Sequence, residues 1–234
     1  MNNIAAPDQS FNPAHVLSFD LETTSANPFE ARIVTSALVR IDSSGAHPVE
    51  LLADPGVEIP EAASKVHGIS TEYAREHGEP HEAVLKRTVD EIYAAWEEGF
   101  TLVVYNAPYD LTVLRQLTGD FVVKGPVYDP YLIDRSMDRF RKGKRTLTDL
   151  CSVYGVRIDN AHEATSDALA AARIAWMQAK KRFKDDLAAY SHDELMEYQA
   201  VQYYELQKDM KKYLDGLGRD TSTVNFGWPM QNSR

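Results

Sequence analysis

Asp20 and Glu22 are two acidic residues separated by one position. They lie at the end of a short apolar run that begins at Val16. Side chains at positions i and i+2 of a strand point to the same face. The two carboxylates would then lie close together at the edge of a hydrophobic core, where their repulsion is costly. A hard divalent cation, which prefers oxygen ligands, would neutralise them. The alternative is a surface turn with two solvated acids, which is common for an isolated Asp-x-Glu triplet.

Two further acids and a histidine follow at the ends of other predicted elements. Asp110 comes after the apolar run Leu102–Tyr105, and Asp167 opens an Ala-rich helix that extends to about Phe183. His162 precedes Asp167 by five residues, which would place the two side chains about 140° apart on one helix. For the two to converge, His162 must lie in the loop before the helix.

The order and spacing of these residues resemble the DEDDh group of 3'-to-5' exonucleases, a proofreading superfamily with a ribonuclease-H-like fold. The chain matches the first motif of that family at Asp20–Thr23, the second at Asn106–Asp110 and the third at His162–Asp167. Three motifs in order, each after its expected element, are far more specific than any one of them. The turn Val66–Ile69 is also similar to one in the proofreading (epsilon) subunits of bacterial DNA polymerase III.

Two positions distinguish this chain within the family. The sister group has a tyrosine where this chain has Glu163, so His162 indicates the His subgroup. The second motif often reads His-Asn-Ala-x-Phe-Asp, and here Tyr105 replaces the His and Tyr109 replaces the Phe. These differences leave Asp110 in place and concern how the terminal nucleotide is held.

The resemblance implies hydrolysis of phosphodiester bonds at the 3' end of DNA, in proofreading or repair, with release of nucleoside 5'-monophosphates. Single-stranded or frayed 3' ends would be the substrate. Two divalent cations, Mg²⁺ or Mn²⁺, would be held by Asp20, Glu22, Asp110 and Asp167. His162 would take a proton from the attacking water, a task suited to an imidazole with an unperturbed pKa of about 6.5. The implied contacts to the terminal nucleotide are Leu21, Thr23, His67 and Asn106.

Other functions are compatible with the same motifs. An exoribonuclease of the same superfamily would differ by room for, or a hydrogen bond to, the 2'-hydroxyl. A catalytically silent, polymerase-associated binding module would be marked by loss of an acid or of the histidine, and all five candidates are present. A structural Ca²⁺ site is disfavoured, because no single loop supplies the ligands.

The elements around these residues predict an α/β fold: a ribonuclease-H-like mixed five-stranded sheet flanked by helices, with a helical C-terminal extension. The first strand, a strand within Ala31–Asp42 and a return strand at Val49–Ala53 suggest an antiparallel meander. The continuous apolar run Leu102–Tyr105 is typical of a buried parallel strand. A strand end is predicted at Val127–Tyr128 and a helix over 80–99. The segment Lys65–Ser70 is predicted to be a compact turn whose Ser70 could start another short helix. The last two predictions are an N-cap at Asp129 and a final helix from the capping box at Ser191 to about Leu214.

Length and composition favour one main domain. The chain has 234 residues and 44% hydrophobic content, which suits one sizeable core. We expect a loose lead-in over 1–14, an exonuclease domain over 15–184 and a C-terminal helix and tail over 185–234. The single cysteine, Cys151, predicts a buried helical thiol and fits a reducing compartment. No membrane-length apolar run or signal peptide is present, so we expect a cytoplasmic protein that does not associate with membranes.

Charge and aromatic residues leave two questions open. The net charge of -10 argues against tight non-specific binding of nucleic acid. Arg135–Arg145 is the one concentrated basic segment, and is either a solvated face or a loop that contacts phosphate. The final helix either packs back on the domain or docks a second copy or a polymerase partner, with Trp228 as an anchor. Trp96 and Trp176 are predicted core residues.

Overall fold

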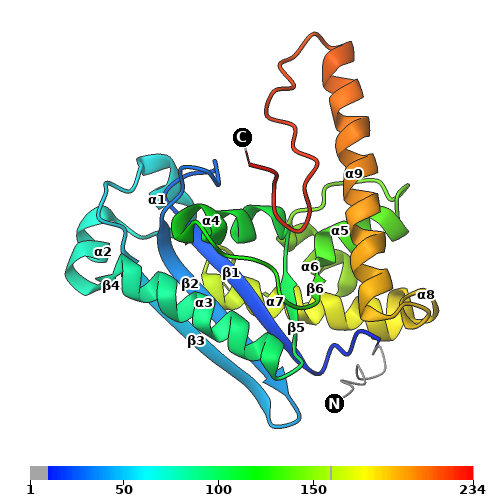
Figure 1. The fold of residues 1–234 in the computed structure, drawn as a ribbon, viewed down its shortest axis with the longest axis horizontal. Helices are drawn as coiled ribbons and strands as arrows, with labels where there is room; N and C mark the ends of the chain where they lie inside the picture. The colour runs from blue at the N-terminus through cyan, green and yellow to red at the C-terminus, as the bar shows by residue number, and fades with distance from the viewer. Residues whose placement is uncertain (1–9, 159, 234) are drawn as a thin grey trace, which may run out of the picture.

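A six-stranded mixed sheet forms the centre of the computed structural model, which describes residues 10–158 and 160–233 (Figure 1). The strands are β1 (Val16–Thr23), β2 (Ile33–Asp42), β3 (Gly45–Asp54), β4 (Glu79–Pro80), β5 (Thr101–Val104) and β6 (Val127–Tyr128), in the order β4-β3-β2-β1-β5-β6. The predicted meander β1-β2-β3 and the parallel strand β5 are confirmed. The predicted number of five strands is one too low, because β4 has only two residues and shows no periodicity.

The register of the sheet determines where the chain leaves it. β1 lies between β2, which is antiparallel to it, and β5, which is parallel. Val104, the last residue of β5, pairs with Phe19. The chain therefore turns out of β5 directly beside Asp20, at the carboxyl end of a parallel strand, where α/β proteins bind ligands.

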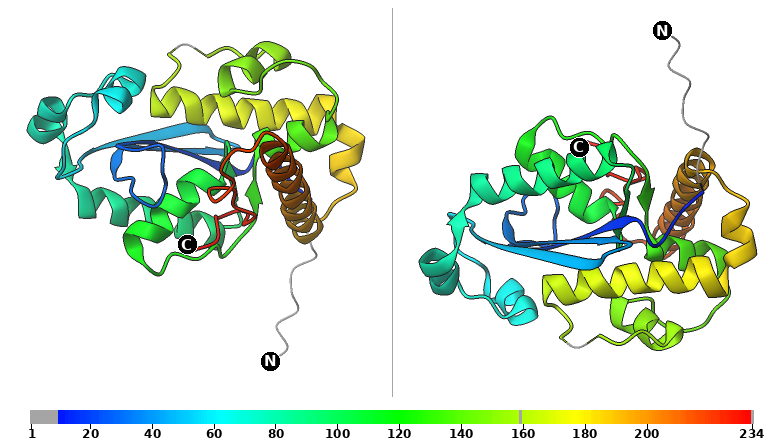
Figure 2. Two further views of the ribbon diagram at one scale, coloured as in Figure 1. Left: turned by 90° about the horizontal axis from the view of Figure 1, so that it is seen from above. Right: turned by 90° about the horizontal axis from the view of Figure 1, so that it is seen from below.

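Helices cover both faces of the sheet. They are α1 (Glu61–His67), α2 (Thr71–His77), α3 (His81–Glu97), α4 (Pro108–Thr118), α5 (Pro130–Met137), α6 (Leu147–Tyr154), α7 (Ala164–Met177), a π-helical turn η1 (Gln178–Arg182), α8 (Lys184–Ala188) and α9 (His192–Gly216). Seen from above and from below, α7 covers one face, and α3 and α4 cover the other (Figure 2). The centre of the sheet is thereby buried between two helical layers, whereas the first six residues of β3 are exposed.

Two local predictions need correction. The expected turn at Lys65–Ser70 contains the last turn of α1. The helix start predicted at Ser70 is confirmed, because Ser70 is the N-cap of α2 and accepts a hydrogen bond from the Tyr73 N–H at 3.1 Å. The α-helical part of the Ala-rich helix ends at Met177, six residues before Phe183, and continues as η1. The π turn keeps Gln178 fully buried, where its side chain pairs with the Tyr128 hydroxyl and the Pro130 carbonyl.

The buried residues test the predicted core. Trp96 is buried and packs near Phe121, and Cys151 is buried on α6, so both predictions are confirmed. The prediction for Trp176 is wrong, because its side chain is 41% exposed on α7. Helical periodicity marks an apolar face, but only a neighbouring element can cover it.

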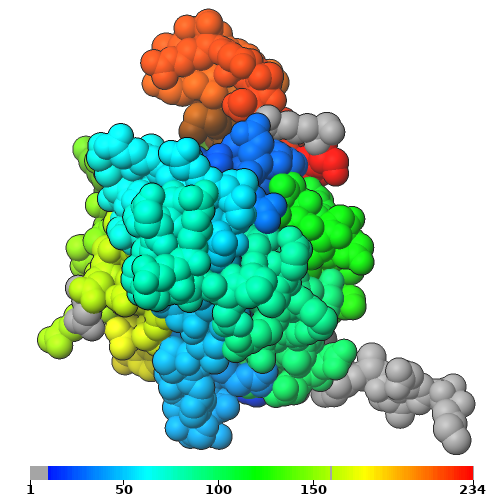
Figure 3. Space-filling view, turned by 90° about the vertical axis from the view of Figure 1, so that its left-hand side faces the viewer, coloured from blue at the N-terminus to red at the C-terminus, as the bar shows by residue number. Residues whose placement is uncertain are grey.

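The C-terminal extension leaves the domain and then returns to it. Leu195, Gln199 and Tyr203 of α9 are buried, whereas the outer part of the helix stands clear of the domain (Figures 1 and 3). The tail runs back beside α9, and its Trp228 and Met230 pack against the main hydrophobic cluster. The predicted packing of the extension on the domain is thus seen for the first half of α9 and for the end of the tail.

The N-terminal lead-in is only partly within the described residues, because residues 1–9 lie outside them. In the described part, Phe11 is buried and stacks on Tyr128 with ring centroids 4.0 Å apart. Residue 11 is therefore attached to the core beside β6. Among the described helices, none is both long and apolar enough to span a bilayer.

Candidate active site

β1 presents its two acids to one cavity. Asp20 and Glu22 both line a cavity of about 460 Å³, as expected for positions i and i+2 of a strand. The pairing of β1 with β2 shifts between Glu22 and Thr23, so Glu22 opposes Thr35 whereas Thr23 opposes Ile33. Such irregularities turn side chains at functional sites and end the regular ladder.

Asp110 reaches the same cavity from α4. After β5, Asn106 adopts a left-handed conformation (φ 61°) that turns the chain into the helix. The buried Asp129 carboxylate accepts hydrogen bonds from the backbone N–H groups of Asn106 and Ala107, each at 3.0 Å. Asp110, in the first turn of α4, accepts a hydrogen bond from the Leu21 N–H at 3.1 Å. The turn therefore places this carboxylate against the backbone of Leu21, the β1 residue between Asp20 and Glu22.

Asp129 also has the capping role that the sequence predicts. Its side chain accepts hydrogen bonds from the Tyr131 and Leu132 N–H groups at the start of α5. One buried carboxylate thus serves the first turn of α5 and the turn that precedes α4. The structure adds the second of these roles, which adjacent residues in the sequence do not reveal.

Asp167 comes from α7, which lies across β1. The Ser18 hydroxyl donates to the Ala168 carbonyl at 2.6 Å, which joins the first turns of α7 to the middle of β1. Asp167 lines the cavity beside Asp20 and Glu22. All four acids predicted as metal ligands therefore share one cavity, although they come from three separate elements.

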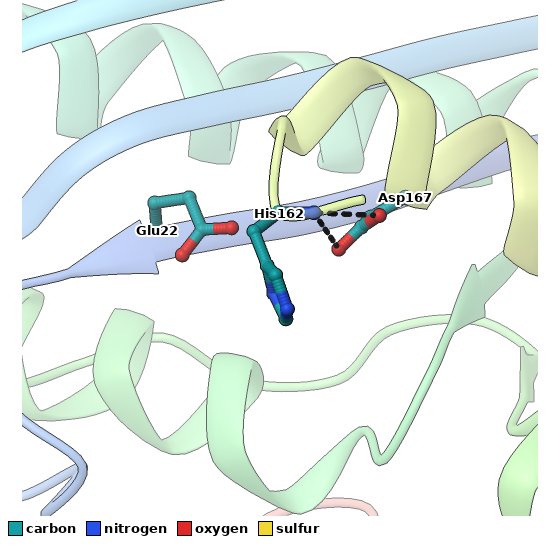
Figure 4. Close-up of side chains that lie close together, drawn as sticks. All are labelled: Glu22, His162 and Asp167. Carbon is teal, nitrogen blue, oxygen red and sulfur yellow. Dashed lines mark hydrogen bonds between the residues drawn. The ribbon is translucent and has the colours of Figure 1, made fainter. Parts of the chain in front are cut away.

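His162 lies in the loop before α7, as the spacing argument requires. It has a left-handed backbone (φ 69°), and its N–H donates to both oxygens of Asp167 at 3.3 Å. Its imidazole extends from this loop and lies between the side chains of Glu22 and Asp167 (Figure 4). One potential ligand atom from each of the three residues lies within 4.8 Å of the others. A left-handed conformation is rare for residues other than glycine, and it is often found at functional sites.

A second cavity adjoins the first. It has a volume of about 590 Å³ and shares Leu21, Glu22 and Tyr109 with the first cavity. Thr23 and His67 line this second cavity, and Asn106 lines the first. The four residues predicted to contact a nucleotide are thus distributed over two connected spaces.

Four residues that were not predicted as site residues also line the first cavity, namely Tyr105, Tyr109, Tyr131 and Arg145. The Tyr109 hydroxyl contacts the Thr23 hydroxyl and donates to the Ser25 carbonyl. Tyr105 precedes the second motif and Tyr109 lies within it, so their departure from the common pattern was the available signal. Arg145 ends the basic segment Arg135–Arg145, which was the available signal for it, whereas Tyr131 has no comparable signal.

Burial and mutual repulsion make this cluster a poor place for four negative charges. Burial, and then the neighbouring Asp110, raise the pKa of Asp20 well above its usual value. Burial raises the pKa of Asp110 to about 8 and that of Glu22 to about 7, and it also raises the pKa of Asp167. The cluster therefore holds protons near neutral pH unless cations replace them. A set of carboxylate oxygens around an open cavity fits hard divalent ions such as Mg²⁺ or Mn²⁺.

The sequence of this chain is similar to those of known proteins. The sequence profile of the exonuclease family RNase_T matches residues 17–175. A PolC-type DNA polymerase III from Clostridium perfringens is 27% identical over 180 residues, which cover 74% of this chain and 12% of the polymerase. The match leaves out most of that much longer protein.

Solved structures of exonuclease I have the same fold. E. coli exonuclease I in complex with a dT13 oligonucleotide has a TM-score of 0.62 at 20% identity, over 73% of this chain and 42% of that one. A moderately thermophilic exonuclease I from Methylocaldum szegediense has a TM-score of 0.63 at 18% identity, over 82% and 45% of the two chains. This chain spans less than half the length of either. With the profile match over most of its domain, the chain belongs to the RNase_T exonuclease family.

Proposed function

We propose that this protein is a DEDDh-type 3'-to-5' exonuclease that removes nucleotides from single-stranded or frayed 3' ends of DNA, in proofreading or repair. The observation that carries the proposal is the shared cavity of Asp20, Glu22, Asp110 and Asp167, with His162 beside two of them. Membership of the exonuclease family supports the hydrolytic chemistry.

The four acids would hold two divalent cations, Mg²⁺ or Mn²⁺. Such ions lower the pKa of a water molecule and neutralise the charge that develops at the scissile phosphate. His162 accepts the proton of the attacking water through its imidazole, which projects from an exposed loop position. The water oxygen bonds to phosphorus while the bond to the 3' oxygen of the preceding nucleotide breaks, and that oxygen takes up a proton. A nucleoside 5'-monophosphate and a shortened strand leave.

The second cavity would receive the terminal nucleoside. It is the more apolar neighbour of the acidic site, with Ala63, Val66 and His67 from α1 on one side and Thr23 from β1 on another. Burial lowers the pKa of His67, so its imidazole is neutral at neutral pH and can contact an uncharged base or sugar. Leu21 and Asn106 would contact the nucleotide where the two cavities meet.

An end-labelled oligonucleotide assay tests the proposal. Wild-type protein with Mg²⁺ or Mn²⁺ should release 5'-mononucleotides from the 3' end of single-stranded DNA, and a chelator should stop the release. His162→Gln should reduce the rate by about 10²–10⁴-fold. The matched control is His47→Gln, which replaces an exposed histidine on β3. Full activity of His162→Gln would remove this residue from its role, and faster release from RNA would favour the exoribonuclease.

We also propose that residues 185–234 are an extension for partner binding, appended to an exonuclease domain over 15–184. Met210 and Tyr213 on the outer part of α9, and Leu217 directly after it, are about half exposed or more. Such a surface suits a second copy or a polymerase subunit. Light scattering on the full chain and on a chain ending at Phe183 tests self-association. A monomer in both cases would exclude a homodimer formed through this helix.

A further inference from the structure

The segment between α5 and α6, residues 138–146, has a charge opposite to that of the whole protein. We call it the α5–α6 loop. It contains five basic residues and one acidic residue, and so has a formal charge of +4, whereas the chain has -10. Such a contrast marks a place where an anion can be attracted to an otherwise acidic protein.

Two of the arginines hold the loop in place. Arg145 Nε and Arg141 Nη2 donate to the same oxygen of the buried Asp134, at 2.7 and 2.8 Å. The other Asp134 oxygen accepts from the Tyr154 hydroxyl at 2.8 Å. Arg145 Nη2 also donates to the Asp138 carbonyl at 2.7 Å. These bonds are internal, so Arg141 and Arg145 shape the loop, and the remaining basic side chains are the ones presented outward.

The outward side chains are of two kinds. Lys142 and Lys144 are exposed, and within the described chain neither ammonium group makes a salt bridge or a hydrogen bond. Between the basic residues lies Phe140, which is 91% exposed, an unusual state for a large apolar side chain. Arg139 pairs with Asp209 of α9, but both groups are more than half exposed, so the pair is weak and can exchange partners.

The loop is continuous with the acidic cavity. Arg145 lines the first cavity together with Tyr105 and Tyr131. The Tyr105 hydroxyl donates to the Arg145 carbonyl at 2.6 Å, and the two tyrosine rings lie 5.9 Å apart. None of these three residues lines the second cavity. A strand whose terminal nucleoside fills the second cavity would therefore pass the acids and leave the first cavity on the side of the α5–α6 loop.

We infer that the α5–α6 loop binds the single-stranded nucleic acid on the 5' side of the bond that is cut. Lys142 and Lys144 contact phosphates, and Phe140 stacks against a base. Lys144 lies one residue and Lys142 three residues before Arg145, which lines the cavity, so both lie within about 12 Å of Arg145 along the chain. Basic groups interleaved with an aromatic ring bind single strands without sequence preference. The inference rests on the proposed exonuclease function and adds the path of the strand.

Two substrates of different length test the inference. The p-nitrophenyl ester of thymidine 5'-monophosphate is short enough to occupy only the cavities, whereas a 12-nucleotide single strand reaches the loop. The variants are Lys142→Gln/Lys144→Gln and Phe140→Ala. The control, Lys86→Gln/Arg87→Gln, removes two exposed charges from α3. Thermal denaturation checks that each variant is folded.

We expect each loop variant to raise KM for the 12-nucleotide strand about tenfold at low salt, with kcat and hydrolysis of the ester within twofold of wild type. The double lysine variant should also reduce the slope of log affinity against log salt by about 1.4, because two phosphate contacts are lost. The control should keep the wild-type slope and KM.

Two results would overturn the inference. Unchanged KM and salt slope would show that the strand does not touch the loop, and the loop would then be a protein-binding surface. Equal losses on both substrates would show that the loop only supports the site. If the wild-type protein hydrolyses neither substrate with any divalent ion, the proposed function fails. In that case fluorescence anisotropy with the labelled 12-nucleotide strand still decides whether the lysines bind it.

Discussion

Replacement of Asp110 by Asn separates the stability of this protein from its activity. Burial raises the pKa of Asp110 from 3.8 to about 8. Between these values the folded protein keeps a proton that the unfolded chain has lost. The free energy of unfolding therefore falls as the pH rises from about 4 to about 8. In the metal-free protein, ionisation of this acid destabilises the fold.

The size of the effect follows from the shift. Each pKa unit corresponds to about 1.4 kcal/mol, so a shift of four units sets an upper bound of about 6 kcal/mol. The cavity is open to water and the neighbouring acids share protons, so we expect Asp110→Asn to stabilise the metal-free protein by about 2 kcal/mol at pH 8. The substitution keeps an oxygen that can accept the hydrogen bond of the Leu21 N–H. For a chain of this length, 2 kcal/mol corresponds to roughly 4–8 °C in Tm.

Urea and thermal unfolding of both proteins at pH 8 and pH 4.5, with a chelator or with Mg²⁺, measure this. With a chelator the variant should be the more stable protein at pH 8, and the difference should be much smaller at pH 4.5, where both side chains are neutral in the folded state. Mg²⁺ should stabilise the wild type more than the variant, and the variant should lose nuclease activity. Equal stability of the two metal-free proteins at pH 8 would refute the reasoning, because Asp110 would then not be held against its preferred ionisation.

Three further outcomes are expected. The affinity for Mg²⁺, measured by calorimetry, should rise between pH 6 and pH 8, because Glu22 (pKa about 7) and Asp110 (pKa about 8) must release protons to bind the ion. A constant affinity over this range would argue against these acids as ligands. Asp129→Ala should lower the free energy of unfolding by about 3 kcal/mol or more in urea titrations, because four backbone N–H groups lose their acceptor. Asp129→Asn should lower the free energy of unfolding by less. Equal, small decreases for both variants would contradict the dual role of Asp129. Tyr109→Phe should raise KM for a short strand several-fold with little change in kcat, because the hydroxyl that contacts Thr23 is removed; a fall in kcat alone would place Tyr109 in the chemical step.

The sequence alone was enough to determine features that depend on neighbouring residues. Asp20 and Glu22 face one side of β1 because a strand repeats every two residues. His162 had to lie outside α7, since the helical repeat would otherwise separate it from Asp167. The cap at Asp129 follows from its place directly before Pro130, a residue that favours the first helical position.

Only the tertiary structure decided what lies between distant segments. It joined Asp110 to the Leu21 N–H across 89 residues, and it brought Arg145 to a buried Asp134 rather than to solvent. It left the Trp176 side chain exposed on α7. Local rules fix the direction in which a side chain leaves its own strand or helix. Which neighbour it meets depends on packing between elements, whose register and partners no short stretch of sequence specifies.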